Sequence, residues 1–187
     1  MNSVVRGSVA DIARQNGASI ATTFLSVDVV VLCDTSGSMA ARDSVGGRSR
    51  YDQACNELAS LQTNMPGKIG VISFSDQVMF CPDGTPLYFG GGTDLAGALQ
   101  YAKIADVPNS GIRFIVISDG EPSSESAALK VAHTYHSRID VIFCGDERFP
   151  TGRDFLQRLA KASGGQAVTA SAVKGLAASV TKLLAAA

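Results

Sequence analysis

Four stretches of almost unbroken apolar residues, separated by segments of helical periodicity, constrain the fold of this chain more than any other feature. They cover residues 27–33, 68–74, 112–118 and 138–144, and they are rich in Val and Ile. A strand with one solvated face alternates apolar and polar residues, whereas the inner strands of a parallel sheet are apolar on both faces. The stretches therefore predict buried parallel strands.

Segments with apolar residues at helical spacing alternate with these strands. They cover residues 49–67, 93–105, 123–137, 152–165 and 171–185. Ser49 with Asp52 resembles a capping box, and Pro122 is suitably placed as a first helical residue. Residues 77–81 follow a short turn and predict an antiparallel edge strand, and residues 166–170 predict a short last strand. This order predicts an α/β fold, a three-layer doubly wound (Rossmann-like) sheet, mostly parallel with one antiparallel edge strand, and helices on both faces.

Length and charge restrict the classes of protein that fit. The 187 residues suit one domain, which we place at residues 23–187, after an N-terminal extension at 1–22 with room for a short helix from Val9 to Gln15. Lys and Arg number 16 against 17 Asp and Glu, a formal net charge of -1. This balance argues against a nucleic-acid groove and against a membrane-binding surface.

The cysteines indicate a compartment. There are 4, they form no C-x-x-C pair, and their spacing fits no zinc pattern. They are typical of small core residues in a reduced protein, so we expect a cytoplasmic location.

Oxygen-bearing side chains follow two of the predicted strands and open one predicted helix. The first strand ends in "DTSGS", which supplies Asp34, Ser36 and Ser38, the loop "GGGTDL" supplies Thr93, and "IVISDG" ends in Asp119. Ligands of doubly wound sheets bind beyond the carboxyl ends of the strands, so we expect these groups to converge. If the first loop stays extended, its alternating residues share one side. Hard oxygens without His or thiol suit magnesium, with manganese or calcium as substitutes, and argue against zinc and copper.

The three motifs together resemble the von Willebrand factor A (vWA) domain with its metal-ion-dependent adhesion site. The resemblance covers nearly the whole chain from the first strand onward. It implies that Ser36, Ser38 and Thr93 bind the cation through their hydroxyls. It implies that Asp34 and Asp119 hold the cation largely through water or by orienting the hydroxyls. A Glu or Asp of a partner protein would then complete the coordination, and stand-alone microbial members suggest an AAA+ ATPase or a larger multiprotein system as partner.

Two other functions compete with a protein-binding module. A magnesium-dependent phosphohydrolase resembling the haloacid dehalogenase family also has an Asp after the first strand, but that family requires D-x-D, and Ser36 stands in place of the second acid. No general base accompanies a nucleophile, so we expect no enzyme activity. The other alternative is an assembly module whose metal only stabilises the fold.

Some side chains near these motifs have simpler interpretations. Asp94 and Glu121 are expected to be solvated or helix-N-terminal carboxylates rather than extra ligands. Arg50 is expected to be an ordinary surface charge. His133 and His136 are expected on a solvated helical face, because no third ligand lies near them in sequence.

Overall fold

Strand β1 lies at the centre of a six-stranded sheet whose order is β3-β2-β1-β4-β5-β6. This computed structural model describes residues 4–43, 47–146, 148 and 150–169. The strands are β1 (Val29–Asp34), β2 (Ile69–Phe74), β3 (Val78–Phe80), β4 (Arg113–Ser118), β5 (Ile139–Phe143) and β6 (Ala167–Thr169). Among the described strands, only the edge strand β3 pairs antiparallel, as the sequence predicts, and the other pairings are parallel.

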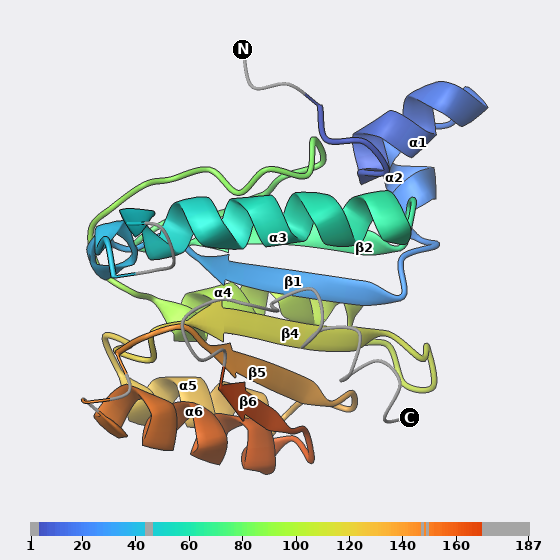
Figure 1. The fold of residues 1–187 in the computed structure, drawn as a ribbon. Coiled ribbons are helices and arrows are strands. Elements are labelled where there is room, and N and C mark those ends of the chain that lie inside the picture. Colours follow the sequence, from blue (N-terminus) through green and yellow to red (C-terminus); the bar gives the residue numbers. More distant parts are fainter. Residues whose placement is uncertain (1–3, 44–46, 147, 149, 170–187) are drawn as a thin grey trace.

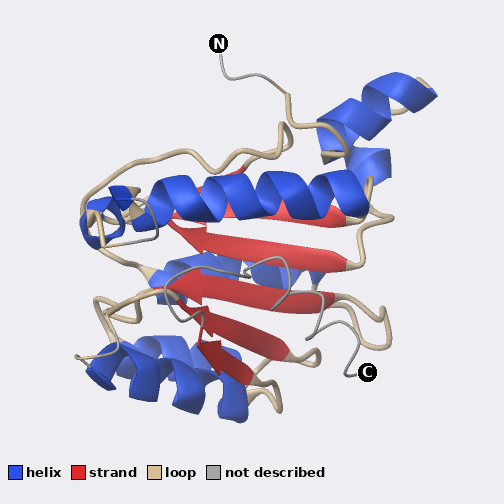
Figure 2. Ribbon diagram, viewed as in Figure 1, coloured by secondary structure: helices blue, strands red, loops and turns tan. Residues whose placement is uncertain are grey.

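Helices cover both faces of the sheet, which confirms the predicted three-layer architecture (Figures 1 and 2). The α-helices are α1 (Val9–Asn16), α2 (Ile20–Phe24), α3 (Arg50–Asn64), α4 (Leu95–Ala102), α5 (Glu125–Ala132) and α6 (Pro150–Ala162), and the 3-10 helices are η1 (Gly37–Ala40) and η3 (Lys103–Ala105). Helix α3 packs on one face, and α4, α5 and α6 pack on the other. The closing helix predicted at 171–185 lies outside the described residues.

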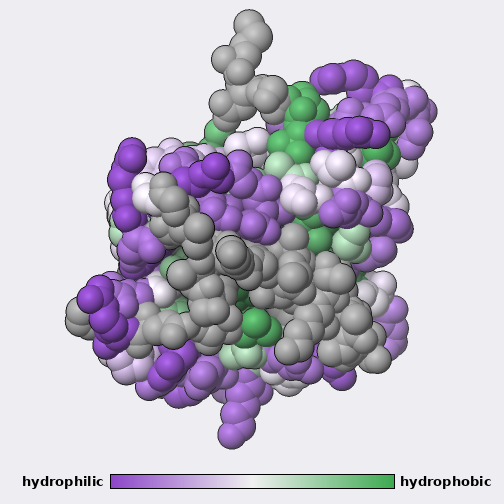
Figure 3. All heavy atoms as spheres, in the orientation of Figure 1, coloured by the Kyte–Doolittle hydropathy of each residue, from purple (hydrophilic) through white to green (hydrophobic). Residues whose placement is uncertain are grey.

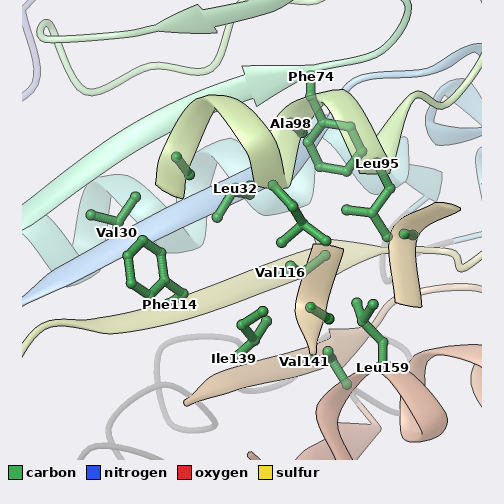
Figure 4. Packing of buried hydrophobic residues seen from close by; sticks show 14 of the residues in the cluster. Val30, Leu32, Phe74, Leu95, Ala98, Phe114, Val116, Ile139, Val141 and Leu159 are labelled. Carbon is green, nitrogen blue, oxygen red and sulfur yellow. The ribbon is translucent and has the colours of Figure 1, made fainter. Parts of the chain in front are cut away.

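The alternation of side chains along each strand divides the core into two clusters. In β1, Val30 and Leu32 point toward α4, whereas Val31 and Cys33 point toward α3. Figure 4 shows the larger cluster, where residues of β1, β4 and β5 meet α4 and α6. Burying a Leu or Phe side chain stabilises the fold by about 1.5–3 kcal/mol, so these two faces hold the sheet between its helices.

Helix α5 differs from the sequence prediction at its start. Pro122 is not its first residue, because the helix begins at Glu125 with Ser124 as N-cap, whose side chain accepts a hydrogen bond from the Ala127 N–H. The backbone N–H of Ser123 instead donates to the Thr93 carbonyl (2.9 Å), which keeps this segment outside the helix.

The N-terminal segment contacts the sheet domain through backbone hydrogen bonds and through buried side chains of α1. Helix α1 forms where the sequence leaves room for it, and its Val9 is buried in the larger core cluster. The Ala10 N–H donates to the Pro82 carbonyl (2.9 Å), and the Gly67 N–H donates to the Gly7 carbonyl (2.8 Å). The division at residue 22 stays a prediction, and α2 spans it.

The face of the molecule seen in Figure 3 is mostly hydrophilic over α3 and α6. Both helices place their apolar residues toward the sheet, including Leu58 and Leu61 of α3 and Phe155 and Leu159 of α6. Their outer faces are therefore ordinary solvated surfaces.

Candidate metal centre

The predicted site lies between β1 and β4, where the connections of the sheet diverge. Both strands are central neighbours in parallel register, with Cys33 opposite Ile117. The chain leaves β1 through α3 toward β2, and it leaves β4 through α5 toward β5, on the opposite side. Such a divergence opens a crevice beyond the carboxyl ends of the two strands. Asp34 ends β1, and Asp119 follows the last residue of β4, so both carboxylates lie at this crevice.

The carboxylate of Asp34 is buried and held on both oxygens. Its Oδ1 accepts the Ser36 N–H (2.9 Å), and its Oδ2 accepts the Ser118 hydroxyl (2.6 Å), with the residue 0% exposed. Burial raises the pKa of Asp34 to about 6, although the hydrogen bonds from Ser118 and Ser36 lower it, and nearby Asp119 raises it further. A positive charge beside this buried carboxylate would stabilise its ionised form.

The two serines of the first loop lie together. Their hydroxyl oxygens are 3.1 Å apart. The condition considered in the sequence analysis, an extended loop through Ser38, is not met, because residues Gly37–Ala40 form the 3-10 helix η1 with Ser36 as its N-cap. The tight turn thus brings the two hydroxyls together. Ser36 is buried, whereas Ser38 is exposed, so this side of the crevice opens to solvent.

The loop that carries Thr93 is attached to both neighbouring loops. The Gly37 N–H donates to the Gly91 carbonyl (3.0 Å), and the Gly90 N–H donates to the Thr35 carbonyl (2.9 Å). On the other side, the Thr93 N–H donates to the Ser123 hydroxyl at 3.4 Å. Thr93 is 6% exposed and lies two residues before α4. The backbone therefore places Thr93 between the loops that follow β1 and β4.

Asp119 contacts a residue that the sequence analysis misjudged. Its Oδ2 accepts Nη1 of Arg50 at 3.0 Å, and the Arg50 side chain is only 11% exposed. Arg50 is therefore not an ordinary surface charge; it begins α3, the helix above this end of the sheet. The other oxygen, Oδ1 of Asp119, is buried and has no hydrogen-bond partner among the residues that the structure describes.

The donor set fits a hard divalent cation. Burying a carboxylate oxygen without a partner is costly, and a cation would satisfy Oδ1 of Asp119. Within the described part of the chain, no group of three or more His, Cys, Asp and Glu side chains gathers in a way that could hold a metal. A site here must therefore depend on hydroxyls together with two carboxylates, as magnesium and manganese accept.

The remaining candidates behave as ordinary residues. Asp94 is the N-cap of α4, and its Oδ1 accepts the Gly97 N–H (2.9 Å). His136 lies beyond α5, and its backbone N–H donates to Asp106 (2.8 Å). Burial raises the pKa of the Cys33 thiol well above its usual value, so this thiol stays protonated.

Four residues around the site were missed by the sequence analysis. Ser118 and Ser123 support Asp34 and Thr93, and Arg50 and Asp43 form an ion pair beside Asp119. Ser118 could have been predicted from the sequence. It immediately precedes Asp119, and if β1 and β4 pair in parallel, their carboxyl ends bring Ser118 close to Asp34. Arg50 and Asp43 carry no such signal, because neither residue follows a predicted strand.

The structure is thus a doubly wound domain with oxygen-bearing side chains where the connections of its sheet diverge. Its fold is that of a vWA domain, as comparison with solved structures shows. BatB, a conserved hypothetical protein from Bacteroides thetaiotaomicron, superposes with a TM-score of 0.64 at 20% identity, over 85% of this chain and 99% of that chain. The manganese-loaded TRAP protein of Plasmodium vivax gives 0.57 at 17% identity, over 84% and 71%. The SpRpn10 VWA domain gives 0.55 at 15% identity, over 86% and 95%.

The sequence alone is distant from known families. No family model matches it, and no curated protein matches it either. Among the helices that the structure describes, none combines the length and the hydropathy needed to cross a membrane.

Proposed function

We propose that this chain is a metal-dependent protein-binding module, which holds Mg²⁺ between β1 and β4 and uses it to bind an acidic residue of a partner. The observation that carries this proposal is the buried Oδ1 of Asp119, which has no hydrogen-bond partner among the described residues, at the same edge of the sheet as the Ser36–Ser38 hydroxyl pair. The manganese-loaded vWA structure among the similar folds supports a divalent cation, and Mn²⁺ or Ca²⁺ would serve as substitutes.

The neutral and the charged residues of the candidate site would have different roles. Ser36, Ser38 and Thr93 offer neutral hydroxyls, while Asp34 orients the first loop through the Ser36 N–H (2.9 Å). When bound, the cation supplies a positive charge that attracts a carboxylate. Gly37 and Ser38 are exposed, so a partner side chain has access from solvent.

The phosphohydrolase alternative predicts turnover, and we expect none. With magnesium present, the protein should release no phosphate from a broad panel of phosphomonoesters, because Ser36 replaces the second acid of D-x-D. A colorimetric phosphate assay checks this. Phosphate release that disappears in Asp34→Asn would instead establish the enzyme.

The partner is proposed to be a protein, in the manner of an AAA+ ATPase or a larger multiprotein system. Affinity capture from the native host, with magnesium and with chelator, would identify it. The four free cysteines support a reducing compartment, and we propose the cytoplasm.

Thr93→Ala should weaken partner binding more than cation binding. Thr93 belongs to a different loop from the serines, and Gly90 and Gly91, which precede it at positive φ (70° and 77°), would serve as the hinge if this loop shifts when a carboxylate binds. We expect a loss of about 1–3 kcal/mol in partner affinity, the scale of a hydrogen bond to a charged group. Paired calorimetric titrations of the cation and of the captured partner measure this. Partner affinity that responds neither to Thr93→Ala nor to chelator would place recognition elsewhere on the surface.

A further inference from the structure

One guanidinium lies between two carboxylates beside the candidate metal centre. We infer that Arg50 sets the charge of this site: it weakens cation binding and makes the cation-loaded site selective for an anionic ligand. This inference rests on the proposed function, because it concerns the same cation and the same incoming carboxylate.

Arg50 is held in place by contacts on several sides. Its backbone N–H donates to the Ala41 carbonyl (3.1 Å), and Nη1 donates to Asp119 Oδ2 (3.0 Å). Its Nε donates to both carboxylate oxygens of Asp43, at 3.0 and 3.2 Å. A guanidinium that is fixed by two carboxylates and is 11% exposed cannot swing into solvent without losing charge-assisted hydrogen bonds.

The charges of the buried groups favour an anion only when Arg50 is present. Asp34 and Asp119 contribute −1 each and Arg50 contributes +1, so these three sum to −1, and a divalent cation brings the sum to +1. Without Arg50 the sum is −2, and the same cation brings it to zero. Asp43 has a side chain that is 43% exposed, so water screens its charge more than those of the other three groups.

The positive charge of Arg50 has opposite effects on the affinity of the site for the cation and for the incoming carboxylate. Arg50 already binds Oδ2 of Asp119, and the cation would lie at the other side of the same carboxylate, where Oδ1 has no partner. Like charges a few ångströms apart repel strongly in a partly buried site, so Arg50 lowers the affinity for the cation. The same charge attracts a carboxylate that approaches the loaded site.

The test uses the full chain and two probes, Mn²⁺ and acetate. Electron paramagnetic resonance of free Mn²⁺ gives the cation affinity, and water-proton relaxation of the Mn²⁺-loaded protein gives the acetate affinity. We expect Arg50→Gln to bind Mn²⁺ about tenfold more tightly and acetate several-fold more weakly than wild type. Asp43→Asn should change both affinities in the opposite sense by about two- to threefold, because its charge is exposed. Arg48→Gln is the matched control, since Arg48 is an exposed arginine two residues away, and both affinities should stay within about twofold.

The possible results separate a failure of the inference about Arg50 from a failure of the proposed function. Mn²⁺ affinity in Arg50→Gln that is unchanged or weaker than in wild type would overturn the inference, and so would acetate binding that does not weaken. If Arg50→Gln fails to fold, as judged by circular dichroism, Asp43→Asn decides, and Mn²⁺ affinity that does not fall there refutes the charge argument. Absence of Mn²⁺ binding in wild type would refute the proposed function itself.

Discussion

Asp34→Ala should reduce Mn²⁺ or Mg²⁺ affinity by at least about 100-fold, since loss of even a group that orients metal ligands typically costs about 10–100-fold. Asp34 is both a buried negative charge and the acceptor that fixes the Ser36 backbone and the Ser118 hydroxyl. Its removal therefore takes away Coulomb attraction and leaves the serine loop less ordered. Calorimetric titration of the cation measures the effect.

Matched variants separate this effect from a loss of the fold. Asp119→Asn keeps the shape of the side chain and should also weaken binding strongly, because its neutral amide cannot replace the carboxylate at Oδ1. Glu121→Gln removes an exposed charge two residues after Asp119 and should leave cation affinity within about twofold of wild type. Cation affinity that is unchanged in both Asp34→Ala and Asp119→Asn would remove the metal centre from this crevice.

Melting temperatures of the same proteins test the third interpretation, a metal that only stabilises the fold. A cation that binds only the folded state stabilises it by about 2.7 kcal/mol at 100 times its dissociation constant. The two apolar clusters on either side of the sheet involve none of the proposed ligands. We therefore expect wild type to stay folded in chelator with a modestly lower melting temperature, and unfolding by chelator alone would favour the structural metal.

The strand pattern of the sequence was sufficient to predict the sheet. Runs such as residues 112–118 are apolar on both faces, and only a parallel strand between two helical layers buries both. The edge strand β3 was predictable as well, because so short a turn after β2 leaves room only for an antiparallel partner. The start of α5 was predicted wrongly at Pro122, since the tertiary hydrogen bond from the Ser123 N–H to Thr93 overrides a local helix preference.

The site was predictable only where its residues follow strands in parallel register. Asp34 and Asp119 must share one edge of the sheet if β1 and β4 are neighbours. The hydroxyls of Ser36 and Ser38, two and four residues after Asp34, can be recognised from the sequence motif. The environment of Arg50 was not readable. Its pairing with Asp119 joins groups 69 residues apart in sequence, and it depends on how α3 begins above the sheet. Local patterns carry no information about such a contact.

The approach of α6 to the site leads to a second prediction of large effect. A Cβ added at Gly152 would lie 2.2 Å from the Asp119 carbonyl oxygen, and one added at Gly120 would lie 2.3 Å from the Gly152 carbonyl oxygen. Both contacts are with backbone, so no side-chain rotation relieves them. The first turn of α6 thus packs directly on the peptide that carries a proposed metal-binding carboxylate.

Gly152→Ala should therefore destabilise the fold by about 1–3 kcal/mol, the cost of overpacking. In an unconstrained helix the same change stabilises by up to about 1 kcal/mol, so the sign itself is diagnostic. The variant should also weaken Mn²⁺ binding several-fold, because α6 can accommodate the methyl group only by displacing Asp119. Urea denaturation and Mn²⁺ titration measure the two effects.

Gly164→Ala is the control beyond the other end of α6: its φ of 74° makes alanine strained, but no described atom lies within 4 Å of the added Cβ. It should lose stability without losing Mn²⁺ affinity, since it lies far along α6 from the Asp119 peptide. A Gly152→Ala protein as stable as wild type, with unchanged Mn²⁺ affinity, would show that α6 does not hold Asp119 in place.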